Sequence, residues 1–385
     1  MAIRIKCLSD KVFNLFFSIH MKTIAKKDYV HKILIINPFG IGDVLFTTPL
    51  VSCLRRLYPD AFIGYVTNRR ALPVVQSNPK INQVYVYDRD EFTENLIPRW
   101  VSFFKEIRQA QFEVVFDLSL NATFGFFCMA CGIPKRIGYD YRQRGRFLTD
   151  KILLKGYETK HVAEYYLDLL GQLDPSARDV RDDFPTEFFI DHQHQQWAKD
   201  WMKAQGIDLK GKVIAVIPGG GASWGKDAQQ KRWPLEQYVK LLDKIIAKSK
   251  AVVILLGDQK EQRLSQEITR QCSYPVYDAV GTTSLFQMAA LLQLCHLAIV
   301  NDGGPLHVAV AVGTKTVSIF GPVDPMVYGP YVGAGIGAED KHLAIVKGLA
   351  CQPCYRQFRK AFCEHLGCLN HLTVDEVFNQ IERLL

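Results

Sequence analysis

Glycine stands beside residues able to contact phosphate or hold a proton in three short segments of this 385-residue chain. They are Gly40-Ile-Gly-Asp43, Gly219-Gly-Gly221 and Asn301-Asp-Gly-Gly304. Glycine lets backbone N–H groups approach a phosphate, and the N-terminus of a following helix adds positive potential. An aspartate at such a place caps a helix or, in an active site, takes a proton. The pattern predicts a phosphate-binding site with carboxylates beside it.

Two common nucleotide-binding motifs are missing from the sequence. Gly40-Ile-Gly-Asp-Val-Leu45 lacks the third glycine of the dinucleotide fingerprint, and Gly219-Gly-Gly-Ala-Ser-Trp224 lacks it too. The sequence contains no Walker A motif. We therefore expect neither a hydride-transfer enzyme nor a P-loop kinase.

The glycine segments follow short apolar runs that are typical of buried parallel strands. We expect strands at 32–37, 62–66, 83–87 and 114–118, and again at 213–217, 252–256, 297–300 and 316–320. Helical patterns lie between them, at 43–58, at 97–109, after Pro234 and after the capping box of Ser284 and Gln287. This alternation predicts an α/β protein with doubly wound parallel sheets, whose ligand crevice lies beyond the carboxyl ends of the strands.

A polar, charged stretch at 174–185 separates two series of strands and helices, and we interpret it as a linker between domains. The first domain is then 31–180 and the second is 186–350. Nearly every strand of the second series ends in glycine or a small polar turn, which indicates that this domain binds the nucleotide or phosphate. Residues 351–385 form a cysteine-rich tail with a last helix.

Composition narrows the class of protein. Apolar residues make up 48% and charged residues 22%, as in a folded globular chain. The net charge of +8 favours anionic partners: phosphates, acidic glycolipids, a membrane surface or nucleic acid. No uninterrupted apolar run is long enough to predict a transmembrane helix. Six of the ten cysteines are scattered among apolar stretches, which suits a reducing cytosol.

Residues 1–30 have a pattern of their own. Apolar residues from Leu8 to Ile19 share one helical face, and Arg4, Lys11 and Lys22 share the opposite one. One interpretation of the segment is a basic amphipathic helix that lies on an anionic membrane. The other is a leader helix packed on the folded domains, or a frayed extension.

Three longer motifs resemble glycosyltransferase family 9, the heptosyltransferases. They are the segment 33–49, the segment 218–224 with Lys231-Arg-Trp-Pro234, and the segment 300–307 with Phe320-Gly-Pro-Val-Asp-Pro325. They occur in the family's order and span almost the whole chain after residue 30. The resemblance implies a GT-B fold, with two Rossmann-like domains facing across a cleft. It also implies an inverting transfer that needs no metal or other cofactor, usually from ADP-heptose.

The resemblance changes the interpretation of Asp43. On spacing alone it is a helix cap, and a capping carboxylate has a lowered pKa. The family places its catalytic base in this Gly-Asp turn, where it takes the proton of the acceptor hydroxyl. Gly40 and Gly42 would form the loop on the acceptor side.

The resemblance also implies residues that bind the donor. Lys231 and Ser223 match residues that hold the diphosphate, and a lysine there would neutralise the charge of the leaving group. The nucleotide-sugar loop and the ribose-binding acid correspond to Asp302, Gly303, Gly304, His307 and Glu261. Each assignment has an alternative. Lys231 could be a solvated lysine, His307 could pack within its helix, and Glu261 could be a solvated carboxylate in a first helical turn.

The tail holds four cysteines within a short span, Cys351, Cys354, Cys363 and Cys368. Structural zinc, disulfides and buried thiols are the alternatives. The capping box at 373–376 begins a last helix, which we expect to pack back towards the first domain. Asp88-Arg-Asp90 matches the DxD metal motif of another glycosyltransferase fold, and we interpret it as a chance surface match.

We therefore expect a cytoplasmic enzyme, peripheral on the inner face of the membrane, that moves a sugar to a lipopolysaccharide-core or related anionic glycan. We expect no nucleic-acid partner. Two rivals share the GT-B cleft: a nucleotide-sugar epimerase or hydrolase, which needs no acceptor, and a non-catalytic relative that binds a nucleotide sugar or a glycan.

Overall fold

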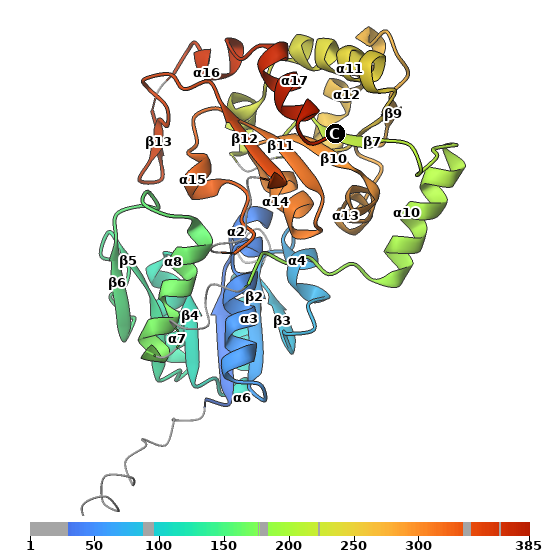
Figure 1. The fold of residues 1–385 in the computed structure, drawn as a ribbon. Helices are drawn as coiled ribbons and strands as arrows, with labels where there is room; N and C mark the ends of the chain where they lie inside the picture. Colours follow the sequence, from blue (N-terminus) through green and yellow to red (C-terminus); the bar gives the residue numbers. More distant parts are fainter. Residues whose placement is uncertain are drawn as a thin grey trace, which may run out of the picture.

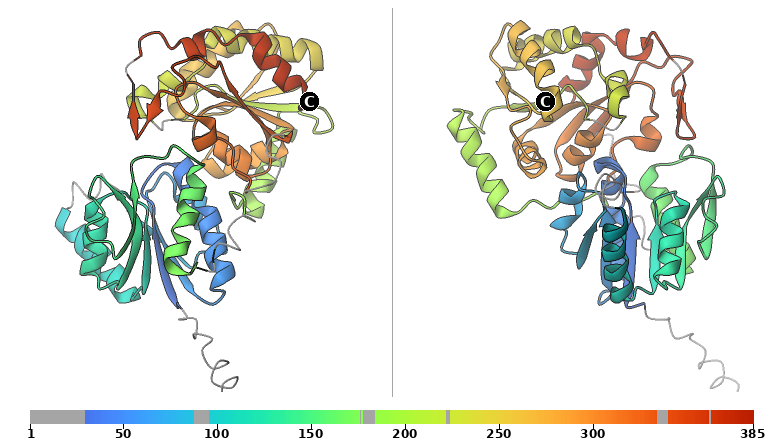
Figure 2. Two further views of the ribbon diagram at one scale, coloured as in Figure 1. Left: turned by 60° about the vertical axis from the view of Figure 1, so that its left-hand side comes forward. Right: turned by 180° about the vertical axis from the view of Figure 1, so that it is seen from behind.

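The computed structural model describes residues 30–87, 96–175, 177, 184–221, 224–333, 340–361 and 363–385. They form two α/β halves, one above the other in Figure 1, and the two further views of Figure 2 show the same stacking. Nearly all of the expected extension at 1–30, the Asp88-Arg-Asp90 sequence and Ser223 lie outside the described residues.

The first half is built on a parallel sheet of six strands in the order β3-β2-β1-β4-β5-β6. The bounds are β1 Lys32–Ile36, β2 Phe62–Thr67, β3 Gln83–Val86, β4 Val114–Asp117, β5 Lys135–Tyr141 and β6 Asp150–Leu154. Residues 33–36 of β1 are fully buried because helices cover both faces of the sheet. The chain order reverses between β1 and β4, which makes the carboxyl ends of these two strands the expected ligand side.

The helices of the first half are α2 Ile41–Leu45, α3 Thr48–Leu57, α4 Leu72–Gln76, α6 Leu96–Ala110, α7 Ala122–Ala130, α8 Val162–Asp168 and α9 Leu170–Leu173. The single helix expected at 43–58 is therefore two helices. Pro49 lies in the first turn of α3 and has no N–H to donate to the carbonyl of Leu45, so α2 cannot continue through it. This break turns α2 into a short element at the end of β1.

The second half has a parallel sheet in the order β12-β11-β10-β7-β8-β9. The bounds are β7 Val213–Ile217, β8 Val252–Leu255, β9 Tyr277–Asp278, β10 Leu297–Asn301, β11 Lys315–Phe320 and β12 His342–Val346. The glycine segments 219–221 and 302–304 follow β7 and β10, which are neighbours at the point where this strand order reverses. The glycine segments of the second half therefore lie side by side.

The remaining elements surround this second sheet. The helices are α10 His192–Ala204, η3 Gly225–Lys231, α11 Leu235–Ser249, η4 Gln259–Glu261, α12 Gln262–Gln271, α13 Leu285–Leu294, α14 Gly304–Ala311, α15 Pro325–Tyr328, α16 Gly367–Asn370 and α17 Val374–Glu382. A two-stranded antiparallel hairpin, β13 Tyr355–Arg356 and β14 Arg359–Lys360, extends from the tail.

The position of the last helix differs from the one expected. α17 packs against α11 on the outer side of the second half, far from the first half (Figure 1). Its apolar residues Val377, Phe378 and Ile381 join the core of the second sheet, and Lys244 on α11 pairs with Asp375. The expectation that this helix packs back towards the first domain is wrong, because its apolar stripe is buried within its own half.

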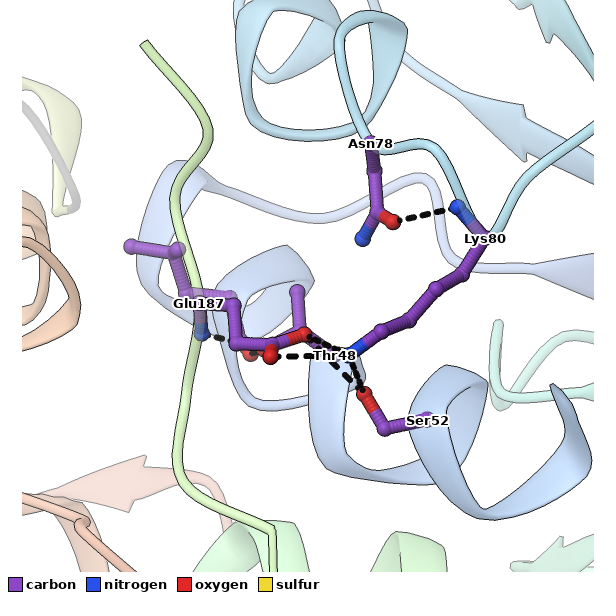
Figure 3. Close-up of polar contacts among 6 residues, drawn as sticks. Thr48, Ser52, Asn78, Lys80 and Glu187 are labelled. Carbon is purple, nitrogen blue, oxygen red and sulfur yellow. Dashed lines mark hydrogen bonds and ion pairs between the residues drawn. The ribbon is translucent and has the colours of Figure 1, made fainter. Parts of the chain in front are cut away.

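The segment that crosses between the halves is anchored to the first one (Figure 3). Lys80 donates to both carboxylate oxygens of Glu187 at 2.7 and 2.5 Å, and Ser52 Oγ donates to the same carboxylate at 3.0 Å. The Glu187 N–H donates to Thr48 Oγ1 at 2.9 Å. These contacts hold the crossing segment on α3 and so set where the second half begins.

Candidate active site

The glycine turns of the two halves face each other. A β-carbon on Gly42 in α2 would lie 2.7 Å from Cδ2 of His307 in α14, and one on Gly304 would lie 3.4 Å from Cβ of Ile41. The ring of Phe46, just after α2, packs edge-on against His307 with their centroids 4.5 Å apart. The N-terminal ends of α2 and α14 therefore meet in direct contact, because glycine at both positions lets the backbones approach.

Asp43 lies in the first turn of α2, at this contact. Gly40 is the N-cap of α2, and Asp43, three residues later, accepts a hydrogen bond from the Gly40 N–H on Oδ2 at 3.2 Å. Burial raises its pKa to about 6, although the Gly40 N–H and the charge of Lys231 act in the opposite direction. The lowered pKa expected of a capping carboxylate is therefore wrong. A carboxyl group with a pKa near 6 is better suited to accept a proton near neutral pH than an exposed aspartate is.

Lys231 and Asp302 form a buried ion pair in the second half. Lys231 Nζ lies 2.6 Å from Asp302 Oδ2, and the two side chains are 8% and 4% exposed. The contact is electrostatic, since Oδ2 accepts no well-aligned hydrogen bond. Both charges act on Asp43, Lys231 lowering its pKa and Asp302 raising it. The alternative of a solvated lysine is thus excluded, and three of the expected site residues are brought together.

The two glycine segments of the second sheet contact each other through their backbones. A β-carbon on Gly303 would collide with the carbonyl oxygen of Gly220. Gly220 has a φ of 73°, in the left-handed region that favours glycine. The side chain of Asn301 ties the turn to its neighbours, because its Nδ2 donates to the Pro218 carbonyl at 2.6 Å and its Oδ1 accepts from Trp233 N–H. The sequence between β10 and α14 thus fixes the shape of the turn after β7.

Glu261 supports the glycine turn 219–221 through hydrogen bonds to its backbone. Its carboxylate is 3% exposed and accepts hydrogen bonds from the N–H groups of Gly221 at 3.0 Å and Asp258 at 3.1 Å. Burial is the largest influence on its pKa, which is raised. The alternative of a solvated carboxylate is therefore excluded. The contacts present are with the glycine turn, and Arg232 provides a partner charge at 3.5 Å.

His307 is buried at the contact between the halves rather than open to a phosphate. Burial drives its pKa well below the ordinary value, so the ring is neutral. A second histidine, His161, also packs against Phe46, with 4.7 Å between ring centroids, and its Nε2 contacts the Gly329 carbonyl oxygen at 3.1 Å. Burial lowers the pKa of His161 to about 4. Two neutral histidines therefore contact one aromatic ring, and both serve packing between the halves.

Sequence reasoning missed two buried polar residues on the first half, His161 and Asp117. Asp117 ends β4, next to β1, and its Oδ1 accepts from Ser119 Oγ at 2.6 Å and Ser119 N–H at 3.0 Å. Burial raises its pKa to about 6. An acidic residue that ends an apolar strand and is followed by Leu-Ser-Leu-Asn was the available pattern for Asp117. His161 follows a polar loop and had no such pattern.

The four cysteines of the tail are free thiols in different surroundings. Cys351 and Cys363 are exposed, Cys354 is partly buried and Cys368 is buried. Burial, and then the proximity of the other thiols, raises the pKa of Cys354. The same two causes raise the pKa of Cys368 to about 11. Within the described residues, no group of three or more His, Cys, Asp or Glu is arranged to hold a metal ion.

In the part of the chain that the structure describes, no helix has the length and apolar character needed to cross a bilayer.

Two doubly wound sheets with facing glycine turns define a glycosyltransferase fold of the GT-B class. A glycosyltransferase family 9 protein from Veillonella parvula DSM 2008 aligns with a TM-score of 0.76 at 22% identity, covering 93% of this chain and 97% of its own. The structure of E. coli ADP-heptose lps heptosyltransferase II aligns with a TM-score of 0.70 at 22% identity, covering 92% and 98%.

The sequence comparisons agree with this fold. The model of glycosyltransferase family 9 (heptosyltransferase) matches residues 100–358. Lipopolysaccharide heptosyltransferase 3 of Escherichia coli K12 is 25% identical over 295 residues, which are 75% of this chain and 82% of that protein. The chain belongs to glycosyltransferase family 9, and it is a glycosyltransferase.

Proposed function

We propose that the chain transfers heptose from ADP-heptose, with inversion, to a lipopolysaccharide-core or related glycan acceptor. The observation that carries the proposal is the convergence of Asp43 from the first half with Lys231 and Asp302 from the second. A transfer between two substrates needs a base on one side and charge compensation on the other. The printed names of the E. coli relatives, heptosyltransferases acting on lipopolysaccharide, support the choice of donor and acceptor.

In the proposed reaction, the acceptor hydroxyl oxygen attacks the anomeric carbon of the donor sugar as its proton passes to Asp43. The bond between that carbon and the diphosphate oxygen breaks, and the electron pair leaves with the nucleoside diphosphate. Attack on the face opposite the leaving group inverts the anomeric configuration in a single step. Protonated Asp43 then returns the proton to solvent.

Lys231 would stabilise the charge that develops on the leaving diphosphate. Its ion pair with Asp302 holds the ammonium group in place beforehand, so that little reorganisation is needed during the reaction. The N-terminus of α14, with Gly303 and Gly304 at its start, would present backbone N–H groups to the same phosphates. In this proposal Glu261 holds the glycine turn 219–221 in shape by accepting the Gly221 N–H. The ribose of the donor would lie next to this turn.

Because Lys231 and the N-terminus of α14 provide the positive charge, we propose that the transfer requires no metal ion. We also place the enzyme in the cytoplasm, at the inner face of the membrane. The free state of the nine described cysteines supports a reducing compartment, and the excess of basic residues supports an anionic acceptor.

The test is transfer with defined substrates. The purified chain is incubated with ADP-heptose and a heptose-containing core oligosaccharide, and products are identified by mass spectrometry and by the anomeric coupling in NMR spectra. We expect an inverted glycosidic product at the same rate with and without EDTA. Retention at the anomeric carbon, or loss of activity in EDTA that added metal restores, would contradict the mechanism. Release of free heptose or an altered donor without acceptor would identify a hydrolase or an epimerase instead.

A further inference from the structure

The β13–β14 hairpin of the tail reaches from the second half to the first. At its base, the N–H groups of Cys354 and Tyr355 donate to the Pro322 carbonyl at 3.0 and 2.9 Å. At its tip, the ring of Phe358 packs edge-on against Tyr141 and Tyr157 of the first half, with 5.1 Å between centroids in both pairs. The hairpin therefore bridges the two halves, and Figure 1 shows β13 above β5 and β6, on the same side of the molecule.

The contact at the tip is close and involves the backbone. A β-carbon on Gly156 would lie 2.6 Å from Cα of Gln357, so the hairpin rests directly on the chain after β6. Gln357 and Phe358 both have positive φ, 52° and 59°, although neither is glycine. A two-residue turn of this type holds the antiparallel partners Tyr355 and Lys360 opposite each other.

Tyr355 and Lys360 both face Trp224, just before η3. The Tyr355 ring is 5.2 Å from the Trp224 ring, and Lys360 Nζ lies 5.4 Å from the centre of that ring. Lys231 Nζ lies 4.6 Å from the same centre. Trp224 is thus the common neighbour of two lysines, one from the glycine-rich junction and one from the hairpin.

The two lysines differ in how firmly their charges are compensated. Lys231 is neutralised by Asp302 in a buried pair, whereas Lys360 contacts Asp227 at 3.3 Å, and the Asp227 side chain is 45% exposed. A leaving nucleoside diphosphate carries more than one negative charge, so Lys231, which also faces Asp302, offsets only part of that charge. An exposed ion pair is weak and is readily exchanged for a phosphate.

We propose that Lys360 is a second cation for the donor diphosphate, held in place by docking of the hairpin tip on the first half. The inference rests on the proposed function, because it assumes that the diphosphate lies beside Lys231. On binding, the phosphate oxygens take the place of Asp227 at the Lys360 ammonium group. The tail is then part of the donor site, and the site is complete only when the two halves are in contact.

The first test measures nucleotide binding by calorimetry and needs no acceptor, so it is independent of transfer activity. The probes are ADP, AMP and inorganic pyrophosphate, with Lys360→Met and Lys360→Arg as variants. Lys347→Met is the matched control, because Lys347 also forms a partly exposed ion pair, with Glu376, away from this site. We expect Lys360→Met to weaken ADP and pyrophosphate binding about tenfold or more, with a smaller effect on AMP and recovery in Lys360→Arg.

Two results would overturn the proposal: unchanged ADP binding in Lys360→Met, or equal weakening of AMP and ADP binding. If the wild-type chain binds ADP in the expected pattern but transfers no sugar, the proposed function fails while the role of Lys360 stands.

The second test asks whether docking of the tip positions Lys360. Gly156→Ala places a methyl group against Gln357, and Gly171→Ala, where nothing lies within 4 Å, is its control. We expect Gly156→Ala to weaken ADP binding as Lys360→Met does, with little further loss when the two are combined. Additive losses in the double variant, or normal ADP binding in Gly156→Ala, would show that Lys360 does not depend on the docked tip.

Discussion

The imidazole of His307 in the second half lies directly against Gly42 in the first, one residue before Asp43. A β-carbon on Gly42 would come within 2.7 Å of the ring. The position of the catalytic aspartate candidate relative to Lys231 therefore depends on a glycine that makes no chemical contribution of its own.

This contact predicts that Gly42→Ala separates the two halves at the site. A displacement of about 1 Å between reacting groups can lower a rate about 100-fold, so we expect a loss of that order in kcat. Gly171→Ala is the control, because nothing would lie within 4 Å of a β-carbon there. Equal activity of the two variants would show that the contact does not set the geometry.

Asp43→Asn should abolish most of the transfer. It removes the proton acceptor while keeping the size of the side chain, and loss of a general base lowers rates about 10²–10⁴-fold. Donor binding should be preserved, since Asp43 lies on the acceptor side. Rate measurements at saturating donor, with ADP affinity measured in parallel, separate the two effects. Near-normal kcat in Asp43→Asn would exclude Asp43 as the base.

The raised pKa of Asp43 predicts how the rate depends on pH. Asp43 must be ionised to take a proton, and its pKa is about 6. The rate should therefore be level above pH 7 and fall about tenfold per pH unit well below pH 6. A pH profile of kcat, with folding monitored over the same pH range, checks this. A falling limb centred near pH 4 would show an exposed, unshifted carboxyl group.

The same shift predicts a change in stability with pH. A carboxyl group whose pKa is higher in the folded state than its ordinary value of 3.8 binds its proton more tightly when folded. The folded state therefore loses stability as the pH rises from about 4 to 6, and the loss is no more than about 3 kcal/mol. Asp43→Asn does not titrate, so its advantage in Tm over the wild type should grow across this window and stay constant above it. A constant difference at all pH values would contradict the shift.

The buried pair of Lys231 and Asp302 predicts a strong coupling in stability. Lys231→Met leaves Asp302 charged, buried and unpaired, which costs about 3–5 kcal/mol in the free energy of unfolding. Replacing both, as Lys231→Met with Asp302→Leu, should recover most of that loss while ADP binding stays weak. Chemical denaturation of the single and double variants measures the coupling. Additive losses in the double variant would mean that the two side chains act independently.

Much of the fold could be predicted because its evidence is local. Val213–Ile217 and Leu297–Asn301 are short apolar runs followed by glycine, and buried parallel strands require this pattern. The capping boxes at Ser284 and Thr373 marked helix starts that the structure confirms. The runs 135–141 and 150–154 gave no prediction, because both contain charged residues beside the apolar ones. The break between α2 and α3 was not predicted, because the apolar spacing of 43–58 fits a single helix and does not show the effect of Pro49.

What the sequence by itself determined was the two series of parallel strands, the glycine turns at their ends and the types of residue in the site. Only the tertiary structure decided which of those residues meet. Asp43 and Lys231 are separated by most of two domains in the chain, and their proximity comes from the contact of α2 with α14. The pKa of Asp43, the buried state of Glu261 and His307, and the reach of the hairpin to Gly156 were likewise settled by packing, because burial and charge proximity depend on segments far apart in sequence.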